Sequence, residues 1–445
     1  MTLFRPSLGS RAVSVFVIVC SIIMVFDSII VAVYMNLRVE PDRITTLRIF
    51  FGLVIFYVIM SYVLLSQSNS YQLIRTSKIR SLNLIHLTAL IIQLTIIAIL
   101  SYIALDLTFE KDYLFSSVVL ATNIAYSFGL ICLSVLFYAF IRWSKLYRSL
   151  VIILYATGFS IMIVYLFTSL ILLNYEFSFA PESIKVRSIK IQIADSSNTL
   201  INHPLLYNAY NYLTIASFLI IWTATVMQLK TTMKHFGNVK YWGALLIALV
   251  YFLFPILANQ FDIFDNLRLG TGSQFDIVYL FIISPYKQIG GLLFGLVFWI
   301  AAKGIKRENL VYSMFISGVG MILIFNSTVI HDVTYLLAPP FGIISLLFTG
   351  IASYLLLTGI FVSSKILAED TFIRSEVYKI VENERSFLKN IGMAETQRVL
   401  ERRIKPILKQ TLPDEIEETE LRSDEDYKEI IREVINELKS NKKKP

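Results

Sequence analysis

The chain has 445 residues, of which 56% are hydrophobic and only 16% are charged. A soluble domain carries nearer a quarter of charged residues, so this composition predicts that most of the chain lies in a membrane. The net charge of +8 is the sum of +10 on residues 1–367 and −2 on residues 368–445, so the positive excess lies in the membrane part, where it reports topology and gives no indication of nucleic-acid binding. The two cysteines imply neither a disulfide framework nor a thiolate metal site.

The apolar residues fall into ten runs, most of them about 20 residues long, which is enough to cross a bilayer as helices. The first run follows Arg5 and Arg11 and is too long for a signal-peptide core, so we expect a retained helix. The predicted fold is all-α, a polytopic membrane protein with about ten transmembrane helices. The runs cover residues 12–35, 48–66, 84–105, 114–141, 149–173, 206–228, 241–259, 284–302, 310–327 and 341–364.

The positive residues between these runs predict the orientation of the chain. With a cytosolic N-terminus, the inner segments carry fourteen Lys and Arg residues and the outer loops carry eight. Cytosolic loops are enriched in these residues, so both termini are expected in the cytosol and the protein in the cell membrane. The loop at 175–205 then lies outside. Its alternating "SIKVRSIKIQIADSS" predicts a small β-hairpin cap.

The stretch "SPYKQIGGLLFG" combines a helix start with a charge. Ser284 and Pro285 suit the first positions of a helix, which places Lys287 in the first turn, where the helix dipole is already positive. A negative neighbour is therefore expected. Either Lys287 meets Asp276 or Asp332 in the water layer, or it lines a pocket that accepts an anion.

A second helix start on the same side is predicted in "LLAPPFGIISLL", at Pro340. The preceding loop holds His331 and Asp332, and Asn326 ends the helix before that loop. We expect these groups to form one outward-facing rim with the start at Pro285. Within the run at 284–302, Gly291 and Gly295 predict close helix packing, or else a close approach to a ligand.

Asp27 stands inside the first apolar run, where an ionisable group needs a partner or a cavity. Three alternatives follow. Asp27 accepts a hydrogen bond from a neighbouring Ser, Thr or Asn, couples to a proton or ion, or pairs with Lys287.

The composition changes after residue 367, which ends the predicted transmembrane domain (1–367). Residues 368–412 are predicted as a cytosolic helical extension with a joint at Gly392, and 413–445 as an acidic linker followed by a short amphipathic helix. An apolar stripe predicts that the extension contacts another helix, either in a second copy or in a protein partner. The stripe consists of Ile373, Val377, Ile380, Phe387 and Ile391.

Catalytic signatures are missing from the sequence. It contains no phosphate-binding loop, no H-E-x-x-H, no G-x-S-x-G and no C-x-x-C, and its four histidines form no helical pair for a metal. The cytosolic tail has no histidine, which excludes a histidine-kinase phosphoacceptor. We therefore expect no enzyme activity, no cofactor and no metal.

The segments "APPFGIISLLFTGIASYLLLTGIFVSSKILAEDTFIR" and "NERSFLKNIGMAETQRVLERR" resemble a group of uncharacterised archaeal multi-pass membrane proteins. Those proteins pair a Pro-Pro-Phe-Gly helix with a charged cytosolic extension, and the resemblance covers roughly residues 284–409. It implies the architecture and brings no activity. The final helix is also similar to the membrane halves of sensor kinases.

The favoured interpretation is a non-enzymatic sensor or scaffold, in which an outer rim acts through the last helix on a cytosolic contact tail. The expected partners are the lipid bilayer, an unidentified ligand and a protein bound through 368–412, and no nucleic acid. One alternative is a secondary transporter of a small solute or ion, because ten spans allow an inverted repeat. Another is an accessory subunit of a membrane complex.

Overall fold

The computed structural model describes the helices and strands of the chain and few of the segments between them. The described residues are 19–24, 26, 27, 30, 43–70, 80–110, 112–147, 149–177, 183–185, 204–230, 238–261, 263, 286–302, 308–327, 340–369 and 387–411.

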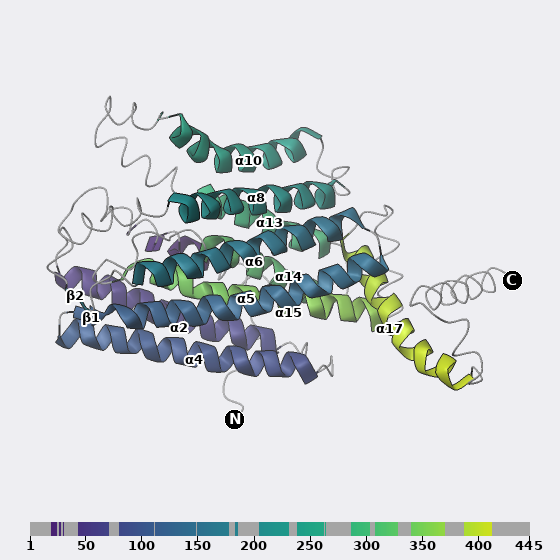
Figure 1. The fold of residues 1–445 in the computed structure, drawn as a ribbon, viewed down its shortest axis with the longest axis horizontal. Helices are drawn as coiled ribbons and strands as arrows, with labels where there is room; N and C mark the ends of the chain where they lie inside the picture. Colours follow the sequence, from purple (N-terminus) through teal and green to yellow (C-terminus); the bar gives the residue numbers. More distant parts are fainter. Residues whose placement is uncertain are drawn as a thin grey trace.

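The described elements are long helices and two short strands (Figure 1). In chain order they are α2 (Arg43–Ser70), α4 (Arg80–Phe109), β1 (Asp112–Leu114), α5 (Phe115–Leu146), α6 (Leu150–Phe177), β2 (Ser183–Lys185), α8 (Pro204–Leu229), α10 (Asn238–Gln260), α13 (Tyr286–Ala302), α14 (Glu308–Ser327), α15 (Ile343–Glu369) and α17 (Phe387–Thr411).

Eight of these helices are long and apolar enough to cross a membrane, namely α2, α4, α5, α6, α8, α10, α14 and α15. Each coincides with a predicted run, so the all-helical, multi-pass architecture is confirmed. α13 lies within the predicted run at 284–302, and the run at 12–35 is described only in part. The structure thus supports eight of the ten predicted spans.

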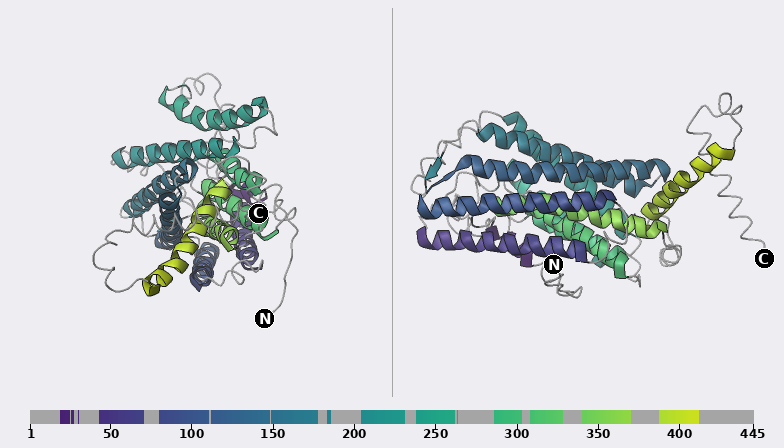
Figure 2. Two further views of the ribbon diagram at one scale, coloured as in Figure 1. Left: turned by 90° about the vertical axis from the view of Figure 1, so that its right-hand side faces the viewer. Right: turned by 90° about the horizontal axis from the view of Figure 1, so that it is seen from below.

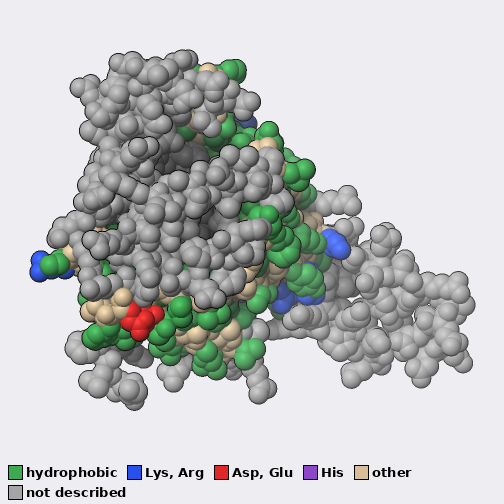
Figure 3. All heavy atoms as spheres, turned by 60° about the vertical axis from the view of Figure 1, so that its left-hand side comes forward, with side chains coloured by type: hydrophobic (Ala, Val, Ile, Leu, Met, Phe, Trp, Pro, Cys, Tyr) green, Lys and Arg blue, Asp and Glu red, His purple; other side chains and the backbone are tan. Residues whose placement is uncertain are grey.

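The helix α5 shows why these sequences form a bundle. Its buried residues recur every three or four positions, the period of a helix, and include Gly129, Cys132 and Leu136. The opposite positions are also apolar, with Ile131 61% exposed and Tyr138 66% exposed. Figure 3 shows hydrophobic side chains over much of the described surface. Such a surface suits contact with lipid.

The centre of the bundle is the helix pair α14 and α15. The most apolar stretch of α15 is entirely buried, whereas only 28% of the corresponding stretch of α4 is buried. α15 contacts α14 and α5 most extensively, and also α2, α4 and α17. α13 covers α14, and α8 and α10 extend from α13 and α6 to one side (Figure 1). α15 is therefore enclosed by helices from both halves of the chain.

Glycines bring α13, α14 and α15 into close contact. A Cβ atom on Gly295 would lie 2.6 Å from the carbonyl oxygen of Gly318, and one on Gly318 would lie 2.6 Å from that of Gly295. A Cβ atom on Gly359 of α15 would lie 2.6 Å from the carbonyl oxygen of Ser313. No larger residue fits at these crossings. The close packing predicted for α13 is confirmed.

The strands β1 and β2 pair antiparallel, with Tyr113 opposite Ile184. The predicted hairpin within 175–205 stays a prediction, because most of that loop lies outside the described residues. β2 comes from that loop, but its partner β1 precedes α5, because the two loops lie at the same end of the bundle. Residues 186–203 lie outside the described part. This end is called the strand end, and the opposite one, which carries α17, the α17 end (Figure 1).

Gly392, the predicted joint of the cytosolic extension, lies inside the continuous helix α17. A Cβ atom there would lie 3.0 Å from the Cβ atom of Leu367, so this glycine serves close packing on α15 and does not break the helix. Residues 370–386, with Ile373, Val377 and Ile380 of the predicted stripe, lie outside the described part. The C-terminal part of α17 projects away from the bundle (Figure 2).

Candidate functional site

Asp27 is fully buried beside the first turn of α15, at the strand end of the bundle. Its Oδ1 accepts a hydrogen bond from the backbone N–H of Gly342 at 2.8 Å. Its Oδ2 accepts two more, from the backbone N–H of Ser345 at 3.1 Å and from the Ser345 hydroxyl at 2.9 Å. Both carboxylate oxygens are thus bound to the first turn of α15.

The backbone explains why a remote residue takes this position. The first N–H groups of a helix have no partner within the helix, and a side chain just before the helix usually accepts from them. Here that position is Gly342, which has no side chain and a φ of 85°, a conformation that favours glycine. Asp27 supplies the missing acceptor, and its negative charge also suits the positive end of the helix dipole.

This geometry corresponds to the first of the three alternatives for Asp27, a hydrogen bond to a serine. The second, coupling to a proton or ion, stays a prediction. The third requires Lys287, which belongs to α13 but whose side chain lies outside the described part. Its predicted acidic partners Asp276 and Asp332 also lie outside the described residues.

The rest of the predicted rim is described only in part. α13 begins at Tyr286, directly after the predicted start at Ser284 and Pro285, and these two residues and His331 lie outside the described part. Pro340 is buried just ahead of Gly342. α13 thus begins one residue after Pro285 and α15 three residues after Pro340, and the pocket between the two helix starts stays a prediction.

Asn326, predicted on the rim, is buried at the contact between α14 and α13. Its side chain is 1% exposed, and neither Oδ1 nor Nδ2 has a hydrogen-bond partner among the described residues. A Cβ atom on Gly291 would lie 3.7 Å from its Oδ1. A buried carboxamide without partners is costly. The structure places it inside the bundle and not on an open surface.

Halfway along α15, Tyr354 joins three helices. Its hydroxyl lies 2.6 Å from Nδ1 of His86 on α4 and 2.9 Å from the hydroxyl of Ser68 on α2. All three side chains are buried. The sequence shows His86 only as one of four scattered histidines. Its partner is 268 positions away, so no local pattern indicates the contact.

Two further buried pairs hold α2 in the bundle. The Tyr57 hydroxyl donates to Oε1 of Gln93 on α4 at 2.7 Å. The Tyr312 hydroxyl of α14 donates to Oε1 of Gln67 at 2.8 Å. Such polar contacts are expected between membrane helices, because lipid offers no alternative partner.

At the α17 end, the first turn of α17 inserts an aromatic side chain between helices. The ring of Phe387 is fully buried, and its centroid lies 6.1 Å from that of Phe140, 5.2 Å from that of Tyr155 and 5.6 Å from that of Phe298. These partners belong to α5, α6 and α13. Phe387 and Ile391 of the predicted stripe are therefore packed within the same chain.

Polar contacts hold the next two turns of α17. The Asn390 amide donates to the Ser149 hydroxyl at 2.6 Å, and Nε1 of Trp143 donates to Oε2 of Glu395 at 3.0 Å. Glu395 is buried and also forms an ion pair with Arg398, at 3.1 Å. A carboxylate with an indole N–H and a guanidinium as partners is compensated for its burial.

Among the residues that the structure describes, no group of three or more His, Cys, Asp or Glu side chains could hold a metal ion. Cys20 and Cys132 are buried and free. No family model, curated protein or solved structure matches this chain. The resemblance to archaeal membrane proteins stays a prediction, and the contacts along α15 are the basis for a functional proposal.

Proposed function

We propose that this chain is a non-enzymatic integral membrane protein of sensory or scaffold type, in which α15 couples the strand end to α17. In this proposal the strand end faces outward from the cell membrane and α17 lies in the cytosol, with both termini. One observation carries the proposal. α15 is buried along its most apolar stretch, Asp27 from the first apolar run holds its start, and Gly392 of α17 packs on its end.

The enclosure of α15 supports coupling along its axis. Gly342 and Leu367 are 25 residues apart, about 37 Å along an α-helix. A close-packed helix moves as a unit, because its side chains fit their neighbours in few arrangements. A shift of the helix start against Asp27 would therefore reach the contact of Leu367 with Gly392.

The placement of α17 supports a role in contacts on the cytosolic side. Its first turns are held by Phe387, Asn390 and Glu395, and its C-terminal part projects from the bundle (Figure 2). A helix docked at one end and free at the other can present its projecting half to a partner. We propose that a ligand or a partner on the outer side changes the position of this half.

Hydrogen exchange on the full chain in lipid nanodiscs tests the coupling. The Asp27→Asn variant removes the charge at the start of α15, and we expect faster exchange in residues 387–395 at the other end. The control is Tyr165→Phe, which removes a buried hydroxyl contact, 3.3 Å long, between α6 and α8. We expect no change in α17 from the control.

The proposal is wrong if Asp27→Asn speeds exchange at the start of α15 and leaves α17 unchanged. Thermal unfolding of both variants distinguishes these outcomes from a general loss of structure. If both variants speed exchange in α17 equally, the effect reflects overall stability, and the coupling through α15 is again contradicted.

A further inference from the structure

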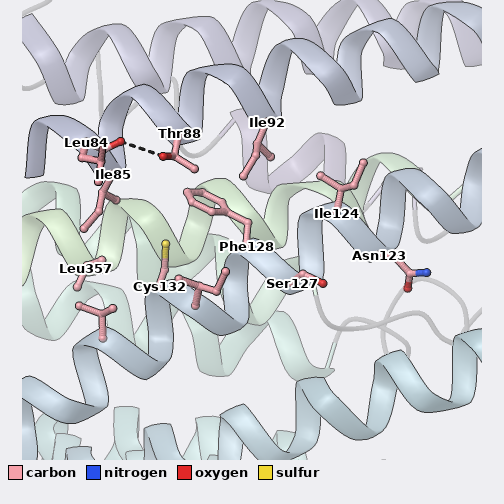
Figure 4. A pocket seen from close by; sticks show the side chains of 12 residues that line it. Leu84, Ile85, Thr88, Ile92, Asn123, Ile124, Ser127, Phe128, Cys132 and Leu357 are labelled. Atoms are coloured by element: carbon pink, nitrogen blue, oxygen red, sulfur yellow. Dashed lines mark hydrogen bonds between the residues drawn. The ribbon is translucent and has the colours of Figure 1, made fainter. Parts of the chain in front are cut away.

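A groove runs along the outside of the bundle between α4 and α5 (Figure 4). It encloses about 440 Å³ and reaches inward to Leu357 of α15. Among the described residues that line it none is charged, and the polar ones are Asn123, Ser127 and Thr88. Its volume is in the range of pockets that bind small molecules.

One of the polar residues in the walls of the groove offers no free hydrogen-bond donor. The Thr88 hydroxyl donates to the carbonyl oxygen of Leu84 in its own helix at 3.0 Å, so it is already satisfied. Phe128 and Cys132 line the middle of the groove, and Asn123 lies at its other end from Leu84 (Figure 4). The groove is therefore mainly apolar, with the Ser127 hydroxyl along it and the Asn123 amide at one end.

The amide end has one hydrogen-bond donor to spare. Asn123 Nδ2 donates to Oδ1 of Asn174 at 3.0 Å, and Asn174 Nδ2 donates to Oδ1 of Asn123 at 3.1 Å. Asn174 Nδ2 also donates to the carbonyl oxygen of Leu170. A carboxamide has two N–H groups, so Asn174 uses both, and Asn123 retains one with respect to the residues that the structure describes. α6 ends at Phe177, so the pair lies near the level at which a membrane helix ends.

The dimensions of the groove decide what fits. From Asn123 to Val135 it follows twelve residues of α5, about 18 Å, comparable with the roughly 15 Å depth of one leaflet. The groove is therefore long enough for much of one hydrocarbon chain within a leaflet.

We propose that this groove binds one hydrocarbon chain of a bilayer lipid, and that the free N–H of Asn123 donates to an ester, ether or hydroxyl oxygen at the head of that chain. The groove lies on α4 and α5, both long and apolar enough to cross a membrane, so a lipid chain is the neighbour that it meets. The apolar walls take the chain, and the amide fixes which end of the groove the lipid head occupies.

Photolabelling tests the occupant. The full chain is reconstituted in phosphatidylcholine vesicles with a trace of phosphatidylcholine that carries a diazirine in one acyl chain. We expect label on residues 127–135 well above that around Leu94, an α4 side chain that is 65% exposed and does not line the groove. Ser127→Trp, which fills the groove from an exposed position, should remove the excess, and Leu94→Trp should not. Equal labelling of both regions, or an excess that survives Ser127→Trp, overturns the proposal.

A second pair of variants tests the amide. Asn123→Leu and Asn174→Leu both break the Asn123–Asn174 pair, but only Asn123 lines the groove. Native mass spectrometry measures the lipid retained after extraction of the full chain. We expect Asn123→Leu to lower retention about twofold to tenfold, the effect of one hydrogen bond, and Asn174→Leu to leave it unchanged. Equal losses of retained lipid in the two variants would assign the Asn123–Asn174 pair a structural role only. Crosslinking of the reconstituted protein that gives a dimer joined through α5 would identify a second copy as the occupant. Either result contradicts the proposal.

Discussion

The two buried acids among the described residues are compensated mainly by hydrogen-bond donors. Asp27 binds two backbone N–H groups and a hydroxyl, and Glu395 binds an indole N–H and Arg398. A carboxylate in a membrane helix is expensive unless its oxygens are bound. Each acid therefore fixes the position of the element that supplies the donors, α15 in one case and α5 in the other.

The first prediction concerns Asp27. Asp27→Ala leaves the start of α15 without its acceptor, and we expect a loss of roughly 2–4 kcal/mol in the free energy of unfolding. Ser345→Ala removes only one of the three hydrogen bonds and should cost about 1 kcal/mol. Unfolding of the purified protein in detergent measures both. Equal stability of Asp27→Ala and wild type would contradict the assigned role.

At the scale of the elements, fit between backbones decides the packing of α13, α14 and α15. Gly295 and Gly318 let α13 and α14 approach closely. The carbonyl oxygen of each glycine lies 2.6 Å from the position that a Cβ atom on the other would take. Lipid is as apolar as a helix surface, so moving apolar side chains from lipid into a helix contact stabilises the contact little. Close van der Waals packing between the helices contributes more.

The second prediction uses glycines as matched positions. Gly318→Ala places a methyl group against backbone and the Trp299 ring, and we expect a loss of about 1–3 kcal/mol from overpacking. Gly52→Ala on α2 meets no atom within 4 Å, and alanine is the better helix former, so stability should stay equal or rise slightly. Thermal unfolding of the two purified variants measures the change in stability for each. Equal effects of the two changes would contradict the close contact.

The third prediction concerns the docking of α17. Ile391 is fully buried, so Ile391→Lys should release the helix from the bundle, whereas Val399→Lys, at a partly exposed position, should not. Chymotrypsin added to the reconstituted protein measures the release, because it cuts after Phe387 and Leu388 once they are accessible. Equal cleavage of both variants and wild type would show that these turns do not depend on docking.

For the whole molecule, the arrangement depends on α14 and α15, which stand in the middle of helices with lipid-facing surfaces. The charges outside the spans set the orientation of this bundle. Cys20 and Cys132 are buried, so they give little background in labelling experiments. The orientation can therefore be tested with single introduced cysteines.

The fourth prediction is that the strand end is outside. Ser188→Cys, in the loop that follows β2, should react with an impermeant thiol reagent on intact cells. Ser423→Cys, in the C-terminal segment, should react only after the membrane is opened. Labelling of Ser423→Cys alone on intact cells would reverse the predicted orientation.

The sequence predicts the positions of the helices well, because the length of an apolar run follows from the thickness of the bilayer. It does not predict which helix lies at the centre, since α4 and α15 are both strongly apolar and yet differ widely in burial. In a membrane, an apolar side chain suits lipid and protein equally, so apolarity carries little information on burial.

The same limit applies to the candidate site. Asp27 is conspicuous in the sequence, but its partners Gly342 and Ser345 lie more than 300 residues later, and nothing local indicates them. Gly392 is predicted to break a helix, because the sequence does not show that Leu367 packs against it. Pairings between loops, such as that of β1 with β2, are also set by the bundle and not by either loop.

The central position of α15 has a consequence for biosynthesis. Of the described membrane helices, α15 is the last to leave the ribosome, yet it fills the middle of the bundle. Until it inserts, the cavity it will occupy is taken by lipid or by loosely associated helices, and Asp27 lacks the N–H groups of residues 342 and 345. A chain that stops before residue 340 therefore leaves Asp27 in the membrane without these hydrogen-bond donors, at the cost of an uncompensated carboxylate.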